Sequence, residues 1–158
     1  MELIVFVGVQ GSGKSTFYAR RFIDTHIRLN LDMLKTRNRE SILFEACLAA
    51  KQPTVIDNTN PTPADRARYI LPAKAQRFRA VGYYFQSTVE ECKRRNALRS
   101  EGRAIPLPGL LGTHTRLVPP RREEGFDELH VVRIAEDGQF LVEPWSARNG
   151  STFRPRSR

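Results

Sequence analysis

Residues 8 to 15 have the composition and spacing of a phosphate-binding loop. They fill every fixed position of the Walker A pattern, in the order Gly8-Val9-Gln10-Gly11-Ser12-Gly13-Lys14-Ser15. An apolar run at residues 3–7 precedes the loop, and residues 16–23 follow it without Gly or Pro. A strand, a glycine-rich loop and a helix N-terminus direct backbone N–H groups toward a polyphosphate. We therefore predict nucleoside triphosphate binding, and the alternative is a glycine-rich turn that binds no ligand.

ATP and Mg²⁺ are the expected ligands of this loop. Lys14 would supply a positive charge to the β- and γ-phosphates, and the Ser15 hydroxyl would supply an oxygen to Mg²⁺. The residues of the loop and of the following turn that we predict to bind the nucleotide are Gly11, Ser12, Gly13, Lys14, Ser15 and Thr16.

Asp32 is the candidate for orienting a hydroxyl group that receives the phosphate. It follows residues 26–30, which are predicted to form a strand. A carboxylate of ordinary pKa can accept the hydroxyl proton, because a loose transition state demands little of the base until the new bond is nearly made. The alternative role for Asp32 is a helix N-cap, and the spacing alone does not choose between the two roles.

Asp57 ends a third apolar segment, residues 54–56, as the Walker B aspartate does. Its carboxylate is expected to hold Mg²⁺ through water or to anchor an arginine of a lid. The next residue is Asn58 rather than a glutamate, so the second acid that activates water in many ATPases is absent. This argues against a motor or a switch protein.

Three arginines, Arg94, Arg95 and Arg99, precede a Gly- and Pro-containing loop at residues 100–108, and Arg103 lies within it. We expect this loop to be mobile and to close over ATP. Arg95 and Arg99 are four residues apart and share a helix face, so we predict that both contact ATP and stabilise the transferred charge. Arg94 is interpreted as a solvated residue. Arg103 is assigned to the substrate-binding residues.

The chain is strongly basic, with 26 Lys and Arg residues against 17 Asp and Glu residues and a net charge of +9. An excess of this size attracts polyanions such as nucleic acid, although solubility is an alternative reason for it. Residues 1–145 are predicted to form one domain, and residues 146–158 a basic, disordered tail. We expect no membrane span. The first strand leaves no room for a signal peptide, so we also expect a cytoplasmic protein.

Strands that alternate with helices predict an α/β P-loop kinase fold, with a mostly parallel sheet, helices on both faces and a C-terminal β-hairpin. The helix expected at residues 39–51 would carry Ile42, Leu43, Ala46, Leu48 and Ala49 on one side. Cys47 and Cys92 are interpreted as buried thiols. The expected strands are 3–7, 26–30, 54–56, 79–85, 128–134 and 140–142, and the other expected helices are 16–23, 61–74, 88–98 and one ending near 117.

These segments resemble the kinase domain of polynucleotide kinase–phosphatase and the phage polynucleotide kinase. The likeness runs in unbroken order from residue 3 to about residue 134. Beyond the generic Walker loop, the more specific matches are Val55-Ile56-Asp57-Asn58-Thr59-Asn60-Pro61 with Arg66-Ala67-Arg68-Tyr69, and Lys93-Arg94-Arg95-Asn96 with Arg99 and Ala104-Ile105-Pro106.

The resemblance implies transfer of the ATP γ-phosphate to a 5′-hydroxyl end of DNA or RNA. In that family the equivalents of Lys14 and Ser15 bind phosphates and Mg²⁺, the equivalent of Asp32 contacts the attacking hydroxyl, and those of Arg95 and Arg99 serve the ATP lid. Lys35 is a departure, because the phage enzyme has an arginine at that position. A lysine neutralises a phosphate but does not grip it with two hydrogen bonds.

The main hypothesis is therefore an ATP-dependent 5′-hydroxyl polynucleotide kinase. The alternatives are a kinase of a nucleoside, a sugar or an antibiotic, and a non-catalytic module whose nucleic-acid binding is gated by ATP. DNA is not distinguished from RNA, and no oligomeric state is predicted. The assigned residues are Lys14, Asp32 and Arg99 for catalysis, Ser15 and Asp57 for the metal, and Asp32, Lys35, Asn58 and Arg103 for the acceptor.

Overall fold

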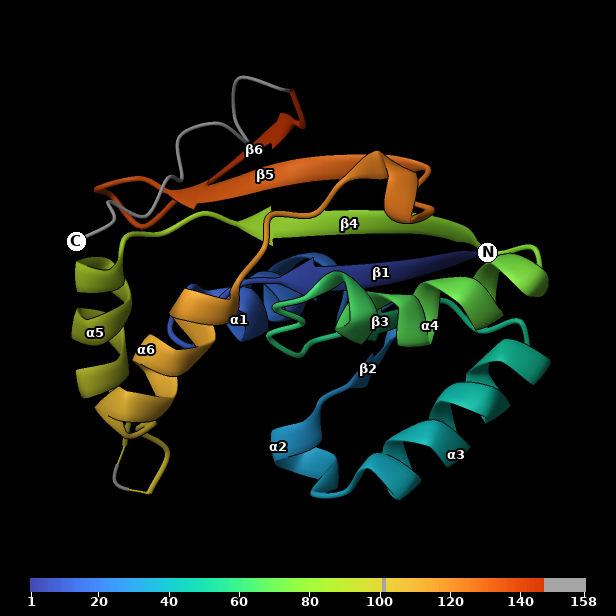
Figure 1. Cartoon of the computed structure of the whole chain (residues 1–158), viewed down its shortest axis with the longest axis horizontal. Coiled ribbons are helices and arrows are strands. Elements are labelled where there is room, and N and C mark those ends of the chain that lie inside the picture. Colours follow the sequence, from blue (N-terminus) through green and yellow to red (C-terminus); the bar gives the residue numbers. More distant parts are fainter. Residues whose placement is uncertain (101, 147–158) are drawn as a thin grey trace.

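A six-stranded sheet organises the computed structural model, which describes residues 1–100 and 102–146 (Figure 1). The strand order is β2-β3-β1-β4-β5-β6, and every neighbouring pair is parallel except β5 and β6, which form an antiparallel hairpin. This confirms the predicted α/β class. The strands are β1 (Glu2–Val7), β2 (Ile27–Leu29), β3 (Thr54–Ile56), β4 (Arg79–Phe85), β5 (Glu128–Ile134) and β6 (Phe140–Pro144).

Strand β1 lies in the middle of the sheet, between β3 and β4, and leads directly into the glycine-rich loop. Its residues 3–7 are all buried and alternate between two clusters of apolar side chains, one on each face of the sheet. A strand covered on both faces reads as a continuous apolar run. The sequence signal of β1 therefore reflects its central position.

Helices cover both faces of the sheet, as predicted. Helix α1 (Lys14–Arg21) packs Phe17 against Phe6 and Phe85 on one face, with ring centroids 5.8 and 5.3 Å apart. Helices α3 (Arg37–Ala49) and α4 (Pro63–Ala75) cover the other face. Their buried apolar side chains are Phe44, Cys47, Leu48, Tyr69, Ile70 and Ala73.

The remaining helices gather near the carboxyl ends of the parallel strands. Helices α5 (Val89–Ala97) and α6 (Leu107–Arg116) lie together there, and the short α2 (Leu31–Leu34) follows β2 (Figure 1). Thr88 caps α5 in a capping box with Glu91, which satisfies otherwise unpaired N–H groups of the first turn. A 3₁₀ turn, η1 (Arg122–Glu124), precedes β5.

The apolar side predicted for the third helix is largely wrong. Ile42 and Leu43 are 59% and 42% exposed, whereas Glu40 and Phe44 are buried together with Leu48. Helix α3 touches the core through a narrow stripe at i, i+4 and i+8, so apolar residues beside that stripe face solvent. The sequence carried too many apolar residues around this helix for its inner face to be identified.

Two other predictions concern the termini of elements and of the chain. Helix α4 begins at Pro63 rather than Pro61, because Thr62 forms its N-cap in a capping box with Asp65. The predicted tail at residues 146–158 lies outside the described residues except for residue 146.

Cys47 and Cys92 are buried free thiols, as predicted. Among the described residues, no helix has the length and apolar character needed to cross a membrane.

Arg66 of α4 is buried with no exposed surface and ties three segments together. Its guanidinium donates two hydrogen bonds to the Glu124 carboxylate, at 2.6 and 2.8 Å, and one each to the carbonyls of Asn60 and Val118, both at 3.0 Å. The carbonyl of Asn60 belongs to the loop after β3, so this contact fixes the loop that borders the candidate site described below. A buried charge with four such hydrogen bonds is strongly dependent on its partners.

We predict that Arg66→Ala destabilises the fold by about 3–5 kcal/mol, because it leaves the Glu124 carboxylate and two carbonyls without their donor. Urea denaturation followed by circular dichroism would measure the loss. The matched control is Arg68→Ala, an exposed arginine of the same helix, which should change stability by about 0.5 kcal/mol or less. Equal effects of the two variants would contradict the assignment of Arg66 as a structural tie.

Candidate active site

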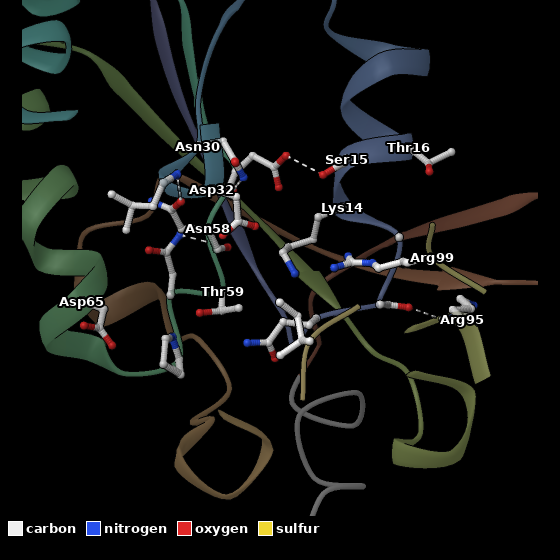
Figure 2. A pocket seen from close by; sticks show the side chains of 18 of the residues that line it. Lys14, Ser15, Thr16, Asn30, Asp32, Asn58, Thr59, Asp65, Arg95 and Arg99 are labelled. Atoms are coloured by element: carbon white, nitrogen blue, oxygen red, sulfur yellow. Dashed lines mark hydrogen bonds between the residues drawn. The ribbon is translucent and has the colours of Figure 1, made fainter. Parts of the chain in front are cut away.

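A cavity of about 460 Å³ opens at the carboxyl ends of the parallel strands, between the glycine-rich loop, α2, the loop after β3, and helices α5 and α6. Figure 2 shows Asp32 and Asn58 on one side of this cavity and Arg95 and Arg99 on the other, with Lys14 between them. Ser12, Lys35 and Arg103 are not among its lining residues. The predicted site residues that do line it are Gly11, Gly13, Lys14, Ser15, Thr16, Asp32, Asp57, Asn58, Arg95 and Arg99.

The glycine-rich loop has a backbone that only glycine adopts without strain. Gly11 and Gly13 have φ angles of +78° and +96°, in the left-handed region. A Cβ atom on Gly11 would also lie 2.7 Å from the Cys92 carbonyl oxygen of α5. The loop therefore packs directly against α5, the helix that carries Arg95. Ser12 is buried, with its hydroxyl 3.4 Å from the Lys14 ammonium.

Lys14 is a buried cation at the centre of the site. Its ammonium donates hydrogen bonds to the carbonyls of Gly8 and Val9, at 2.9 and 2.8 Å. Burial lowers the pKa of Lys14 from its ordinary value of 10.5 to about 8, and the nearby Asp57 carboxylate partly opposes this shift. A phosphate arriving at this position would stabilise the charged form.

A hydrogen-bonded group links Asp57, Ser15 and Arg28. The Ser15 hydroxyl donates to Oδ2 of Asp57 at 3.0 Å, and the side chain of Asp57 is only 1% exposed. Nε of Arg28 donates to the same Oδ2 at 2.7 Å, and Nη2 of Arg28 donates to the Ser15 hydroxyl at 2.9 Å. The arginine bound to Asp57 therefore comes from β2. One of the two roles predicted for Asp57 was to anchor an arginine of a lid, and the structure does not show that contact among the described residues.

Two asparagines hold the turn that presents Asp32. Asn30 caps α2 by accepting a hydrogen bond from Met33 N, and its Nδ2 donates to the Asp57 carbonyl at 2.5 Å. Oδ1 of Asn58 accepts from Leu31 N at 2.9 Å. The N-cap is thus Asn30, which excludes that role for Asp32. Among the described residues, none donates a hydrogen bond to the exposed Asp32 carboxylate, so it stays available to a ligand.

A buried hydrogen-bond network from α3 and α4 holds the Asn58 side chain in place. Its Nδ2 donates to Oε2 of Glu40 at 2.8 Å and to the hydroxyl of Tyr69 at 3.2 Å. The Tyr69 hydroxyl donates to Oε1 of Glu40 at 2.7 Å, and Nη1 of Arg37 donates to both of these groups. Burial, reinforced by the hydrogen bond to Glu40, raises the pKa of Tyr69 to about 12. Tyr69 therefore remains a protonated donor, and Arg37 is anchored at the border of the cavity.

The two arginines predicted to serve an ATP lid, Arg95 and Arg99, differ in their attachment. Nη1 of Arg95 donates to the Gly11 carbonyl at 3.2 Å, which ties α5 to the glycine-rich loop. The guanidinium of Arg99 extends toward Lys14 in Figure 2, and its Nη1 donates to the carbonyl of Arg103 at 3.4 Å. Arg94 is exposed and forms no ion pair within the described residues, in agreement with a solvated role. The side chain of Arg103 is exposed.

Sequence reasoning missed Arg28 and Arg37. An arginine inside a strand that precedes a site aspartate is a usable signal, since a half-buried cation in a strand requires a carboxylate partner. Arg28 would have been found by that argument. Arg37 depends on contacts with Glu40 and Tyr69, and Tyr69 lies 32 residues away along the chain, so the sequence contains no comparable signal for it.

The arrangement suits transfer of a phosphoryl group. It offers an anion-binding loop with a buried cation, two adjacent oxygens from Ser15 and Asp57, and a free carboxylate on the opposite side of the cavity. It also offers Arg99 where negative charge would accumulate. These are the components that phosphoryl transfer requires, because the protein contributes positioning and electrostatic stabilisation and does little covalent chemistry.

We predict that ATP binding, measured without a divalent cation, weakens as the pH rises above about 8. The ammonium of Lys14 is charged below its pKa of about 8 and loses its proton above it, so the affinity should decline by up to about tenfold per pH unit in this range. Calorimetric titration between about pH 7.5 and 9.5, where the ATP phosphates are ionised, would measure it. In Lys14→Met the affinity should be weak and independent of pH, and the same slope in that variant would contradict the prediction.

Comparison with known proteins gives a family and related sequences. Residues 3–108 match the family model AAA_33, described as an AAA domain. A putative bifunctional polynucleotide phosphatase/kinase of Acanthamoeba polyphaga mimivirus is 31% identical over 96% of this chain and 38% of its own length. A bifunctional polynucleotide phosphatase/kinase of Schizosaccharomyces pombe is 30% identical over 83% of this chain and 33% of its own length. The chain therefore spans less than two fifths of either relative.

Solved structures agree on the fold. Kti12 of Chaetomium thermophilum, in complex with ADP-AlF3, has a TM-score of 0.64 at 17% identity and covers 86% of this chain and 92% of its own. A gluconokinase of Sinorhizobium meliloti 1021 has a TM-score of 0.58 at 21% identity and covers 85% of this chain and 83% of its own. The family model matched by residues 3–108 shows that the chain belongs to the AAA domain family, and the fold and nucleotide-binding loop of the chain are those of a P-loop kinase.

Proposed function

We propose that this P-loop kinase transfers the γ-phosphate of ATP, with Mg²⁺, to the 5′-hydroxyl end of DNA or RNA. The observation that carries the proposal is the division of one cavity into two sides. Lys14, Arg95 and Arg99 surround the nucleotide side, and Asp32 stands free on the other side. The relatives named as polynucleotide phosphatase/kinases support the choice of acceptor.

The residues of the nucleotide side fit Mg²⁺. Ser15 and Asp57 present hard oxygen atoms 3.0 Å apart and line the cavity together with Lys14. The described residues contain no group of three or more His, Cys, Asp or Glu side chains that would hold an ion alone. Mg²⁺ commonly binds to one or two protein oxygens, substrate phosphates and water. When bound, it would neutralise charge on the phosphates, with Ser15 and Asp57 as its protein contacts.

The acceptor side favours an anionic substrate. Arg37, at the start of α3, and Arg116, at the end of α6, both line the cavity but lie outside the glycine-rich loop and α5. The anchored Arg37 side chain keeps 45% of its surface exposed. A neutral sugar requires no such cations, whereas a nucleic acid end brings a phosphodiester next to the reacting hydroxyl. The net charge of +9 is consistent with a polyanionic partner.

In the proposed reaction the 5′-hydroxyl oxygen attacks the γ-phosphorus of ATP. A new phosphorus–oxygen bond forms, the bond between the γ-phosphorus and the β–γ bridging oxygen breaks, and ADP leaves. The hydroxyl proton passes to the Asp32 carboxylate. Lys14 and Arg99 stabilise the transferred charge, and Asn58 holds the turn of Asp32. Lys35 and Arg103 stay predicted acceptor contacts, Lys35 at the C-cap of α2 and Arg103 in the loop between α5 and α6.

We predict that Asp32→Asn lowers transfer of labelled γ-phosphate to a 5′-hydroxyl oligonucleotide by about 10²–10⁴-fold, because it removes the proton acceptor. ATP affinity should stay within about twofold, since Asp32 lies on the acceptor side. A filter assay of labelled oligonucleotide and calorimetry with ATP give the two readouts. Asp24→Asn, at an exposed position outside the cavity, is the control with the same change of side chain and should retain wild-type transfer.

If the wild-type protein binds ATP but labels neither DNA nor RNA ends, the proposal that a nucleic acid end is the acceptor is wrong. Phosphorylation of a nucleoside, sugar or antibiotic in its place would then assign a small-molecule kinase. Transfer that survives Asp32→Asn would reject the role of Asp32 while leaving the acceptor unchanged.

We also predict a steep salt dependence of oligonucleotide binding, with a log–log slope of roughly −0.7 for each phosphate contact on a single strand. Arg116→Gln should make the slope less negative by about that amount if Arg116 meets one phosphate. Fluorescence anisotropy at several salt concentrations would measure the slopes. Arg68→Gln, an exposed arginine outside the cavity, should leave the slope unchanged, and a wild-type slope near zero would exclude contact with the phosphate backbone.

A further inference from the structure

Arg28 occupies the two protein oxygens that the proposed metal site would use. Its Nη2 donates to the Ser15 hydroxyl at 2.9 Å, and its Nε donates to Oδ2 of Asp57 at 2.7 Å. Oδ2 of Asp57 also accepts a hydrogen bond from the Ser15 hydroxyl at 3.0 Å. The three groups form a closed triangle of hydrogen bonds. Arg28, the positively charged member of this group, comes from β2, a strand at the edge of the sheet.

We propose that Arg28 competes with Mg²⁺ for Ser15 and Asp57 and so sets the divalent cation concentration at which the enzyme forms its metal–ATP complex. The guanidinium serves as the counter-charge of the buried Asp57 carboxylate until the ion replaces it. This inference rests on the proposed Mg²⁺ site but not on the identity of the acceptor.

Competition follows from the chemistry of the shared oxygens. Mg²⁺ bonds to a hydroxyl or carboxylate oxygen through a lone pair, and near-octahedral geometry leaves little freedom in its position. A guanidinium that donates to the same two oxygens takes up lone pairs that the ion would otherwise use. Two positive centres this close also repel each other, by an amount that grows as water is excluded. Arg28 and a directly bound ion therefore exclude each other from the side of the pair that they share.

The Tyr18 ring already lies beside the Arg28 guanidinium and offers it a surface to move along once it is displaced. The guanidinium carbon of Arg28 lies 5.7 Å from the centroid of the Tyr18 ring, within the range of a cation–π contact. The Tyr18 hydroxyl donates to the His26 carbonyl at 2.8 Å, which holds the ring in place. The Arg28 side chain is 27% exposed, so rotation over this ring carries it toward solvent without unpacking the core. The ion then takes over neutralisation of Asp57.

The test measures metal binding rather than catalysis. Electron paramagnetic resonance would titrate Mn²⁺ into protein saturated with a non-hydrolysable ATP analogue. Arg28→Gln should bind Mn²⁺ about tenfold more tightly than wild type, because a competing charge is removed, while affinity for the metal-free analogue stays within about twofold. Arg28→Lys, which keeps a positive charge on a flexible stem, should fall between the two. Arg20→Gln, an exposed arginine of α1 outside the cavity, is the charge-matched control and should match wild type.

An unchanged or weakened Mn²⁺ affinity in Arg28→Gln would overturn the competition. A weakened affinity would assign Arg28 to support of the metal-bound Asp57 instead. A second measurement uses wild-type protein and does not depend on the folding of a variant. The ¹⁵N–¹H resonance of Arg28 Nε should exchange with water faster once Mg²⁺ and the ATP analogue are added, because its bond to Asp57 is lost. Unaltered protection of this proton would also reject the proposal.

No acceptor is present in either measurement. Failure of the polynucleotide acceptor would therefore leave the Arg28 result intact. Failure of Mn²⁺ to bind in wild type and in all of the variants would reject the metal site itself.

Discussion

The buried carboxylate of Asp57 is the interaction on which the site depends. Its side chain is 1% exposed, so the charge needs hydrogen bonds and a counter-charge, which Ser15 and Arg28 supply. The backbone of Asp57 also joins neighbouring segments, since Asp57 N donates to the Leu29 carbonyl and the Asp57 carbonyl accepts from Nδ2 of Asn30. One residue thereby connects the start of α1, the end of β2, and the turn that precedes α2. Loss of its charge would weaken the contacts to Ser15 and Arg28, whereas the backbone contacts to Leu29 and Asn30 would remain.

The frame around Asp57 explains how the two sides of the cavity are held in a fixed relation. Asn30 reaches from Asp57 to the first turn of α2, and Asn58 holds Leu31 N from the neighbouring loop. Asp32 sits between these two attachments. Glu40 and Tyr69 in turn fix Asn58 from the core. Correct placement of reacting groups accounts for much of the rate in phosphoryl transfer, so a buried hydrogen-bonded frame is better suited to position Asp32 than a free loop.

The parts of this structure that could be predicted from the sequence are those with local causes. The glycine-rich loop, the buried β1 and the hairpin at Asp137-Gly138 depend on residue types at fixed short spacing. The inner face of α3 was mispredicted because its burial depends on which neighbours the sheet provides, and not on its own apolar residues. The contact of Arg28 with Asp57 depends on the pairing of β2 with β3, and the contact of Arg37 with Tyr69 depends on the packing of α3 against α4. Each joins positions about 30 residues apart. Neither arginine has a motif of its own.

The two arginines that were missed differ in what they can offer a ligand. Arg37 is anchored by Glu40 and Tyr69, which lie behind the cavity, so its remaining N–H groups are available whatever the state of the site. Arg28 is anchored by Ser15 and Asp57, which are themselves the oxygens expected to meet the metal. The first adds a constant positive charge to the acceptor side. In the proposed competition, the second is a charge whose position depends on the nucleotide side, because a metal ion would repel the guanidinium and compete with it for the Ser15 and Asp57 oxygens.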